Sequence, residues 1–242
     1  MLGIGTGVHH AGSSYIPMDL KDATSGTALS LQLWLKNNTE VAIGQWKDSS
    51  GNDNHATQSS EANQAAVSGG GLDFEGSESD HYDLASAITI GAQGGFCLAM
   101  VVDLETLSGT VLSKDGFDQF RFIDGTKFRF RSDTSNVTTD FVFESGTFDT
   151  SKALFLLNRS SGSSNKFTFM KNGTTLTADV DNSTNEAAGE NPGGFDLNVL
   201  GSLSGSSQFF DGKILELAFW NRSLTAQEIT DVNSYLQSIH GL

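Results

Sequence analysis

The sequence predicts an all-β sandwich that forms one domain and is closed by a single helix. Short segments of alternating apolar and polar residues follow one another, separated by turns rich in Gly, Asn and Asp. The 27 Gly and only 2 Pro favour tight turns over stiff linkers, and 17 Phe are enough for a large core. All-β sandwiches often reach 242 residues as one unit, so a second domain is not needed.

Residues 1–27 predict an extended N-terminal arm in front of a domain that spans 28–242. The segment is rich in Gly, Ser and Thr and has neither a strand nor a helix period. Two roles remain open, since the arm either packs along its own domain as an edge strand or docks on another subunit. The apolar residues expected to make docking contacts are Leu2, Ile4, Val8, Tyr15 and Ile16.

The domain is predicted to begin with a strand in which every second residue from Leu29 to Leu35 is Leu. The DSSGNDN stretch that follows is a turn, and the carboxylate of Asp48 is suited to capping it. His55 has two interpretations, a catalytic or metal-binding residue and a turn-anchoring one. The second is favoured, because no nucleophile or carboxylate pattern surrounds this histidine.

Residues 69–85 predict a hairpin whose turn is unusually acidic. Leu72 and Phe74 belong to one strand and Tyr82 and Leu84 to the next, with EGSESD between them. The simplest interpretation of this acid-rich corner is a solvated turn. The acids concerned are Asp73, Glu75, Glu78, Asp80 and Asp83.

Strands then follow at short intervals through the middle of the chain, and two pairs are hairpins with Asp124-Gly125 and Asn172-Gly173 at their turns. The first hairpin is expected to place Phe120, Phe122, Phe128 and Phe130 inward and Arg121, Lys127, Arg129 and Arg131 outward. This basic stripe either holds an anionic partner or is an ordinary solvated face, and the second is favoured. The predicted strands are 88–90, 95–105, 109–115, 118–125, 126–132, 137–144, 152–160, 165–173, 174–180 and 195–205.

The longest polar loop, 181–194, is a candidate binding loop, because binding sites of jelly rolls often lie among such loops. Together with the turn after the first strand it supplies the residues expected to face a glycan. They are Asp48, Asn52, Asn54, His55, Asn185, Glu190 and Asn191.

The chain ends with a strand that is apolar on both faces and with one amphipathic helix. Simple alternation in KILELAFW places Ile214, Ala218 and Trp220 on one face and Leu215, Leu217 and Phe219 on the other. Thr225 and Glu228 form a capping box at the start of the helix, and His240 and Gly241 are placed to end it. Ile229, Val232, Leu236 and Ile239 recur at helical spacing as one apolar stripe.

Three stretches together resemble concanavalin A-like lectin/glucanase domains of the laminin-G-like type, over roughly residues 28–240. The first contains Trp34, Trp46, Asp48, Ser50, Gly51, Asn52, Asn54, His55 and Ala56. The second is the GLDFEG hairpin, which departs from the usual pattern at Glu75 and at the inserted His81. The third contains Phe210, Gly212, Ile214, Glu216, Trp220, Asn221, Arg222, Leu224, Thr225, Glu228 and Ile229.

The resemblance implies a concanavalin A-like jelly-roll β-sandwich with a short C-terminal helix and the extended arm in front of it. Some relatives bind calcium through an acid near the hairpin and one from the closing strand. The resemblance thus makes Asp80, Asp211 and Glu216 the candidate ligands, since oxygen ligands suit this cation.

Charge and motifs narrow the function. A net charge of −15 disfavours nucleic-acid binding, which needs a basic face, and the apolar runs are too short for membrane insertion. Cys97 stands alone and is expected in the core, so no internal disulfide forms. Glycosidases of this fold carry paired carboxylates on one strand, and no E-x-D-x-E pattern occurs here. The chain is therefore expected not to be an enzyme.

The arm suggests a structural role, because a Gly-rich leader before a laminin-G-like domain resembles structural proteins of tailed bacteriophages. On this hypothesis the chain is a capsid decoration or fibre subunit assembled in the host cytoplasm. The arm would dock on other virion proteins, a homo-oligomer would be possible, and the sandwich would face outward. The alternative is an extracellular carbohydrate-binding module or adhesin that recognises a cell-surface glycan, assisted by calcium if the acidic corner binds it.

Overall fold

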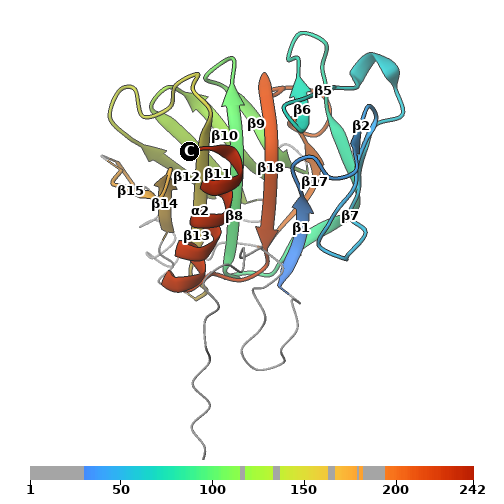
Figure 1. Cartoon of the computed structure of the whole chain (residues 1–242). Coiled ribbons are helices and arrows are strands. Elements are labelled where there is room, and N and C mark those ends of the chain that lie inside the picture. The colour runs from blue at the N-terminus through green and yellow to red at the C-terminus, as the bar shows by residue number, and fades with distance from the viewer. Residues whose placement is uncertain (1–29, 115–117, 133–136, 163–166, 179, 182–193) are drawn as a thin grey trace, which may run out of the picture.

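The computed structural model describes residues 30–114, 118–132, 137–162, 167–178, 180–181 and 194–242 (Figure 1). Two antiparallel sheets lie face to face, and the one α-helix of the described residues covers the outer face of one of them. This arrangement confirms the predicted all-β sandwich with one C-terminal helix. The arm of residues 1–27 and the loop residues Asn185, Glu190 and Asn191 lie outside the described residues.

The first sheet has the strand order β15-β14-β13-β8-β18-β6-β5, with β1 on the same edge of β18 as β6. The closing strand β18 is central to it and pairs with β8 along most of its length. The bounds are β1 Leu31–Leu35, β5 Ala66–Ser68, β6 Gly71–Phe74, β8 Phe96–Leu104, β13 Ala153–Arg159, β14 Phe167–Lys171, β15 Thr174–Leu176 and β18 Gly212–Trp220.

The second sheet has the order β16-β12-β11-β10-β9-β17-β7-β4-β3-β2. Its strand β7 runs from Tyr82 to Ile90, so two segments that the sequence predicted as separate strands form one. The other bounds are β2 Val41–Ala42, β3 Gln45–Trp46, β4 Ala56–Thr57, β9 Gly109–Ser113, β10 Gln119–Asp124, β11 Lys127–Ser132, β12 Val137–Val142, β16 Val180–Asp181 and β17 Phe195–Leu200. A single 3-10 turn, Glu61–Asn63, lies between β4 and β5.

The core between the sheets is built largely of phenylalanine. Phe96 of β8 contacts Phe120, Phe130 and Phe195 of the opposite sheet at ring-centroid distances of 5.2–5.4 Å. The four Phe of the β10–β11 hairpin are at most 1% exposed, as their alternation predicts. Aromatic contacts of this kind stabilise the core beyond the area that they bury.

A β-bulge in β18 corrects the predicted faces of the closing strand. The pairing register with β8 shifts between Ile214 and Glu216. Ile214 therefore packs with Leu217 and Phe219 in the core between the sheets, whereas Leu215 packs with Ala218 and Trp220 under the helix. Simple alternation assigned Ile214 and Leu215 to the wrong faces, because a bulge inserts one residue and reverses the alternation beyond it.

Helix α2, Ala226–His240, starts and ends as predicted. Thr225 and Glu228 form the capping box, and Gly241 ends the helix in the left-handed conformation. The predicted apolar stripe is wrong at one position, since Ile239 is 51% exposed, while Val232, Tyr235, Leu236 and His240 are buried. No helix in the described part of the chain has the length and hydropathy that a membrane crossing requires.

Candidate functional site

Glu216 joins the closing strand to the first strand and to the helix. Its Oε1 accepts a hydrogen bond from Trp34 Nε1 at 2.8 Å, and its Oε2 lies 2.9 Å from His240 Nε2. The Tyr235 hydroxyl also reaches Oε1, at 3.4 Å, and burial and this carboxylate raise the pKa of Tyr235. Glu216 is 1% exposed, has both oxygens engaged and is not among the clustered carboxylates of the described residues.

The turn between β3 and β4, residues 48–54, uses its polar residues to hold itself against β1. Asp48 Oδ1 accepts from the backbone N–H of Trp34 and Ser50, both at 2.8 Å, and its Oδ2 accepts from Asn54 N–H at 3.0 Å. His55 Nδ1 accepts from Asp48 N–H at 3.1 Å, which agrees with the turn-anchoring interpretation.

Two side-chain amides complete this attachment. Asn52 and Asn54 donate to the carbonyls of Leu31 and Gln32 at 2.7 and 3.0 Å. The predicted glycan-facing role of this turn stays a prediction. Its polar side chains already make the hydrogen bonds that fix the conformation of the turn.

The acidic corner gathers a different set of carboxylates from the predicted one. Carboxylate oxygens of Glu75, Glu105 and Asp211 lie within 4.8 Å of one another at the surface. Desolvation, followed by repulsion from Glu105 and Asp211, raises the pKa of Glu75. Lys213 lies 3.2 Å from Glu105 and brings one positive charge to the corner.

The oxygen chemistry of this corner suits a hard divalent cation, for which Glu75, Glu105 and Asp211 would be the ligands. Asp80 plays a different part, since it is 1% exposed and its Oδ2 accepts from Glu75 N–H at 2.9 Å, closing the turn. Of the three predicted ligands, only Asp211 is therefore among the clustered carboxylates.

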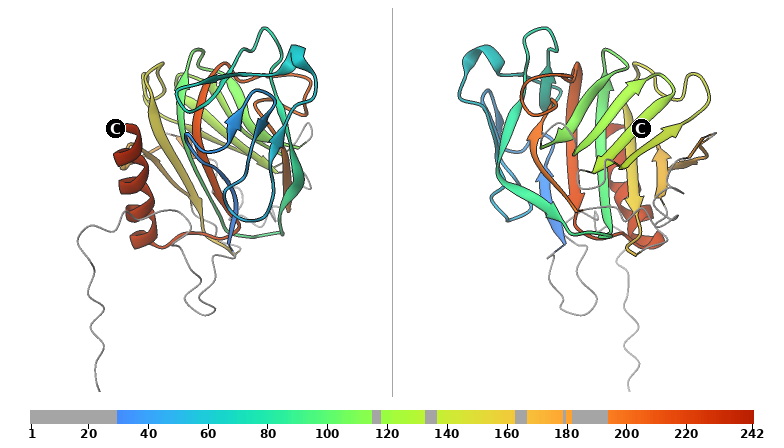
Figure 2. Two further views of the ribbon diagram at one scale, coloured as in Figure 1. Left: turned by 45° about the vertical axis from the view of Figure 1, so that its right-hand side comes forward. Right: turned by 180° about the vertical axis from the view of Figure 1, so that it is seen from behind.

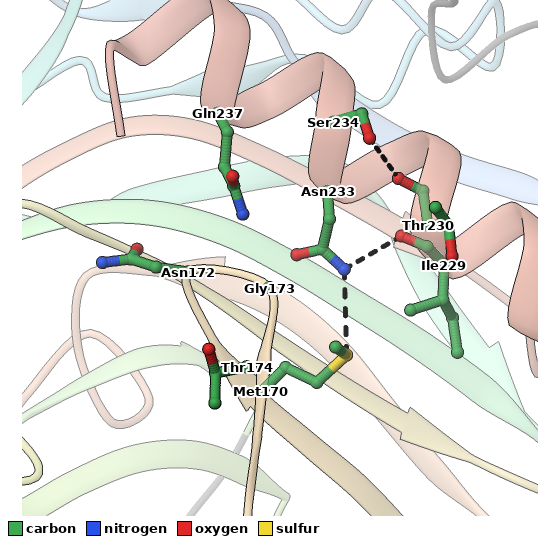
Figure 3. A pocket seen from close by; sticks show the side chains of 9 residues that line it. All are labelled: Met170, Asn172, Gly173, Thr174, Ile229, Thr230, Asn233, Ser234 and Gln237. Atoms are coloured by element: carbon green, nitrogen blue, oxygen red, sulfur yellow. Dashed lines mark hydrogen bonds between the residues drawn. The ribbon is translucent and has the colours of Figure 1, made fainter.

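A pocket of about 320 Å³ lies between α2 and the β14–β15 hairpin (Figure 3). Its lining is uncharged and combines amides and hydroxyls with two apolar side chains. The lining residues are Met170, Asn172, Gly173, Thr174, Ile229, Thr230, Asn233, Ser234 and Gln237.

The hairpin side of the pocket is fixed by its turn. Asn172 and Gly173 both have positive φ, 48° and 77°, which matches the type of hairpin that an Asn-Gly pair predicts. The Asn172 Oδ1 accepts from Leu154 N–H at 2.8 Å and ties the turn to the neighbouring strand. A Cβ at position 173 would lie 2.6 Å from Gln237 Nε2, so a side chain there would displace the Gln237 amide, and the positive φ independently favours glycine.

Asn233 is the most unusual residue of the lining. It is only 5% exposed, and its amide nitrogen donates to the Ile229 carbonyl at 2.9 Å and contacts Met170 Sδ at 3.7 Å. Its Oδ1 has no hydrogen-bond partner and points into the space between the helix and the hairpin (Figure 3). A buried carbonyl oxygen that accepts no hydrogen bond costs about 1–3 kcal/mol of folding free energy, so this oxygen is suited to accept a hydrogen bond from a ligand.

Sequence reasoning missed this pocket, although one signal was present. Asn233 lies four residues after Ile229 and so falls on the apolar face of the helix, where a polar residue is unexpected. Its partner surface, the β14–β15 hairpin, is 60 residues away in sequence, and no local pattern links the two.

The family of the chain follows from a comparison with protein-family models. The model of the concanavalin A-like lectin/glucanases superfamily matches residues 74–230. The chain belongs to this superfamily. The match runs from the end of β6 into the first turns of α2 and so covers most of both sheets of this lectin-like jelly roll. No curated protein matches the chain.

Solved structures share the fold of this superfamily member at low identity. The binding domain of Paraclostridial Mosquitocidal Protein 1 has a TM-score of 0.57 at 13% identity, over 87% of this chain and 52% of that one. Trypanosoma rangeli sialidase in complex with sialic acid has a TM-score of 0.54 at 16% identity, over 93% of this chain and 36% of the sialidase. The chain thus spans about a third of the length of the sialidases, and these likenesses show the fold alone.

Proposed function

We propose that this chain is a non-catalytic carbohydrate-binding domain that holds a neutral saccharide between α2 and the β14–β15 hairpin. The observation that carries the proposal is the unpartnered Oδ1 of Asn233 in an uncharged pocket lined by amides and hydroxyls. Sites for small molecules combine a few fixed polar groups with apolar surface, and this lining has both.

The pocket offers hydrogen-bonding groups of both kinds. A saccharide hydroxyl would donate to Asn233 Oδ1, and the Gln237 side chain, an amide, can both donate and accept. Met170 and Ile229 present apolar surface beside them, which suits the C–H face of a sugar ring. The superfamily membership supports a sugar ligand, and the binding-domain neighbour supports a binding role for this fold.

A non-catalytic role is supported by the engagement of Glu216. This residue is the acid of the closing strand, and Trp34, Tyr235 and His240 surround its two oxygens. A carboxylate held in this way has a structural role and is shielded from any substrate at the surface.

The test is glycan binding by the full chain and by two single variants of α2. Gln237→Ala removes a half-buried pocket amide, and Ser238→Ala changes the next residue, which is exposed and outside the lining. We expect the Gln237 variant to bind a neutral glycan about threefold to tenfold more weakly, the value of one neutral hydrogen bond, and the Ser238 variant to bind it normally. Equal affinity of all three proteins, or no binding to any neutral glycan, would contradict the proposal.

A second proposal is the virion role that the N-terminal leader suggests. Residues 1–27 would attach the domain to a capsid or fibre, and the sandwich would face outward. Deleting residues 1–27 should leave a folded monomer that no longer assembles, as measured by light scattering and circular dichroism. An unchanged assembly state and retained attachment would exclude the arm as a docking element.

A further inference from the structure

The outer face of the β10–β11 hairpin carries four cations in a chain whose net charge is −15. Arg121 of β10 lies directly opposite Arg129 of β11, and Lys127 and Arg131 follow on the same side of β11. Like charges that face each other across two strands are destabilising. The arrangement therefore needs compensation from acids or from a bound anion.

One acid compensates part of the stripe. Asp140 lies opposite Arg129 on β12 and makes a bidentate pair with it, with Arg129 Nε to Oδ1 at 2.7 Å and the second nitrogen to Oδ2 at 2.9 Å. The same Oδ2 lies 4.0 Å from Lys127 Nζ. Both carboxylate oxygens of Asp140 thus interact with cations of β11.

Arg121 is not compensated in this way. Among the described residues no carboxylate lies within ion-pair distance of its guanidinium, and its Nε is buried without a hydrogen-bond partner. Desolvation and the neighbouring Arg129 lower the pKa of Arg121, which shows that its charge is poorly stabilised here.

A hydroxyl group without a partner lies beside it. Thr110 of β9 is opposite Arg121 in the pairing register, so the two side chains share the outer face of the sheet. Thr110 is 0% exposed, and its Oγ1 has no hydrogen-bond partner. The Nε of Arg121 and the hydroxyl of Thr110, both without a hydrogen-bond partner, thus belong to directly opposite residues of neighbouring strands.

We propose that Arg121, supported by Thr110, binds the carboxylate of an acidic saccharide on the outer face of the second sheet. The guanidinium of Arg121 can donate two hydrogen bonds to the two oxygens of a carboxylate. The ligand would therefore give Arg121 the kind of partner that Asp140 gives to Arg129. The net charge of −15 repels long polyanions, so a ligand with few, spaced carboxylates fits better than a highly sulfated one.

This face is separate from the pocket of the proposed function. Seen from behind, β9, β10 and β11 lie in front, with no described helix across them, whereas α2 lies beyond the first sheet (Figure 2). Binding here and binding beside α2 therefore use different sheets, and either proposal can fail without the other.

The test compares galacturonate trisaccharide with a neutral trisaccharide by calorimetry. Arg121→Gln should weaken the acidic ligand at least about tenfold, as the loss of a charged hydrogen-bonding partner predicts. Arg121→Lys should keep part of the affinity, since it keeps the charge without the fork. Lys47→Gln removes one charge from an exposed, remote pair with Glu40. This variant should bind the acidic trisaccharide with an affinity within about twofold of that of the parent.

Two further readouts keep the result unambiguous. The melting temperature of Arg121→Gln should equal or exceed that of the parent, because the change removes a desolvated, repelled charge. The same variant should keep any binding of neutral glycan. The proposal is overturned if the parent does not bind the acidic trisaccharide, or if Arg121→Gln and Lys47→Gln weaken it equally, which would indicate unspecific charge attraction.

Discussion

At the scale of single residues, two kinds of buried polar group matter here, those that are fully engaged and those with an unpaired oxygen. Glu216 belongs to the first kind, with donors from β1 and α2 around both oxygens. Asn233 and Thr110 belong to the second, each with a buried oxygen that lacks a donor. Buried polar groups are rarely unpaired in folded proteins. The first kind therefore stabilises the fold, and the second kind supports the two proposed binding places.

Replacing Glu216 by Ala should destabilise the domain by about 3–5 kcal/mol, as breaking a buried hydrogen-bonded pair does. The change leaves Trp34 Nε1 and His240 Nε2 buried without their acceptor. Urea unfolding measures the loss, and Glu40→Ala, at an exposed pair, should stay within about 0.5 kcal/mol of the parent. Similar midpoints for the two variants would show that the network contributes little.

The acidic corner should make stability depend on pH in a defined direction. Because the pKa of Glu75 is raised above its ordinary value of 4.5, the folded protein binds this proton more tightly than the unfolded chain. The contribution is complete below pH 4.5 and is lost as pH rises through the raised pKa. Relative to Glu75→Gln, the parent should lose a small amount of stability between pH 4 and 7 in urea unfolding, because the side chain is exposed and solvent screens its charge.

A divalent cation should reverse this loss if the corner binds one. Calcium added at pH 7 should raise the melting temperature of the parent and have less effect on Glu75→Gln or Asp211→Asn, because each variant lacks one of the clustered carboxylates. Glu78→Gln serves as the control, since Glu78 lies in the same turn outside the cluster. An equal calcium response in all four proteins would place the cation elsewhere.

At the scale of elements, α2 is fixed by contacts at both ends. Arg222 makes a bidentate pair with the capping residue Glu228, at 2.9 and 2.6 Å. Asn158 of β13 exchanges hydrogen bonds with the backbone of Leu224 just before the helix. At the other end, His240 reaches Glu216. The helix therefore has one defined position on the first sheet, which keeps the pocket beside it formed.

The corrected apolar face of α2 gives a matched pair of variants. Leu236→Ala should cost about 2–5 kcal/mol, because this side chain is 1% exposed and its removal leaves a cavity. Ile239→Ser should change stability by less than about 0.5 kcal/mol, since Ile239 is largely in solvent. Denaturant unfolding distinguishes them, and a large loss at Ile239 would restore the stripe that the sequence alone suggests.

At the scale of the whole molecule, the sandwich separates two different surfaces. The first sheet carries α2 and the uncharged pocket. The second sheet presents the basic stripe of Arg121, Lys127, Arg129 and Arg131 on its outer face. The Phe core between them contacts both sheets and holds them together.

Because the two proposed sites lie on different sheets and share no residue, their binding free energies should be additive. Saturating the pocket with a neutral glycan should change the affinity for the acidic trisaccharide by less than about twofold. In the same way, the double variant Gln237→Ala/Arg121→Gln should lose affinity for the neutral glycan by the amount that Gln237→Ala alone loses, and affinity for the acidic trisaccharide by the amount that Arg121→Gln alone loses. A clear deviation from additivity would mean that one ligand spans both places or that the sheets transmit a change.

Local signals were enough to predict several parts of this protein. The Asn172-Gly173 turn, the inward Phe of β10 and β11, and the capping box of α2 each depend on a few neighbouring residues, and all are confirmed. The first hairpin also forms, but its turn residues are Gly125 and Thr126, because Asp124 is still in β10 and pairs with Lys127. The closing-strand pattern likewise resembled the superfamily to which the chain belongs. The turn-anchoring interpretation of His55 also follows from its immediate neighbours.

The amino-acid sequence by itself determined the fold class, the Asn172-Gly173 turn and the ends of the helix, because periodicity and turn chemistry act over a few residues. Only the tertiary structure decided which face Leu215 joins, that Ile239 stays in solvent and that Glu75, Glu105 and Asp211 gather in one corner. The same holds for Asn233 opposite the Asn172-Gly173 turn and for Thr110 beside Arg121. These pairs are distant along the chain, and strand register, a bulge and helix docking set their distances, which no local pattern encodes.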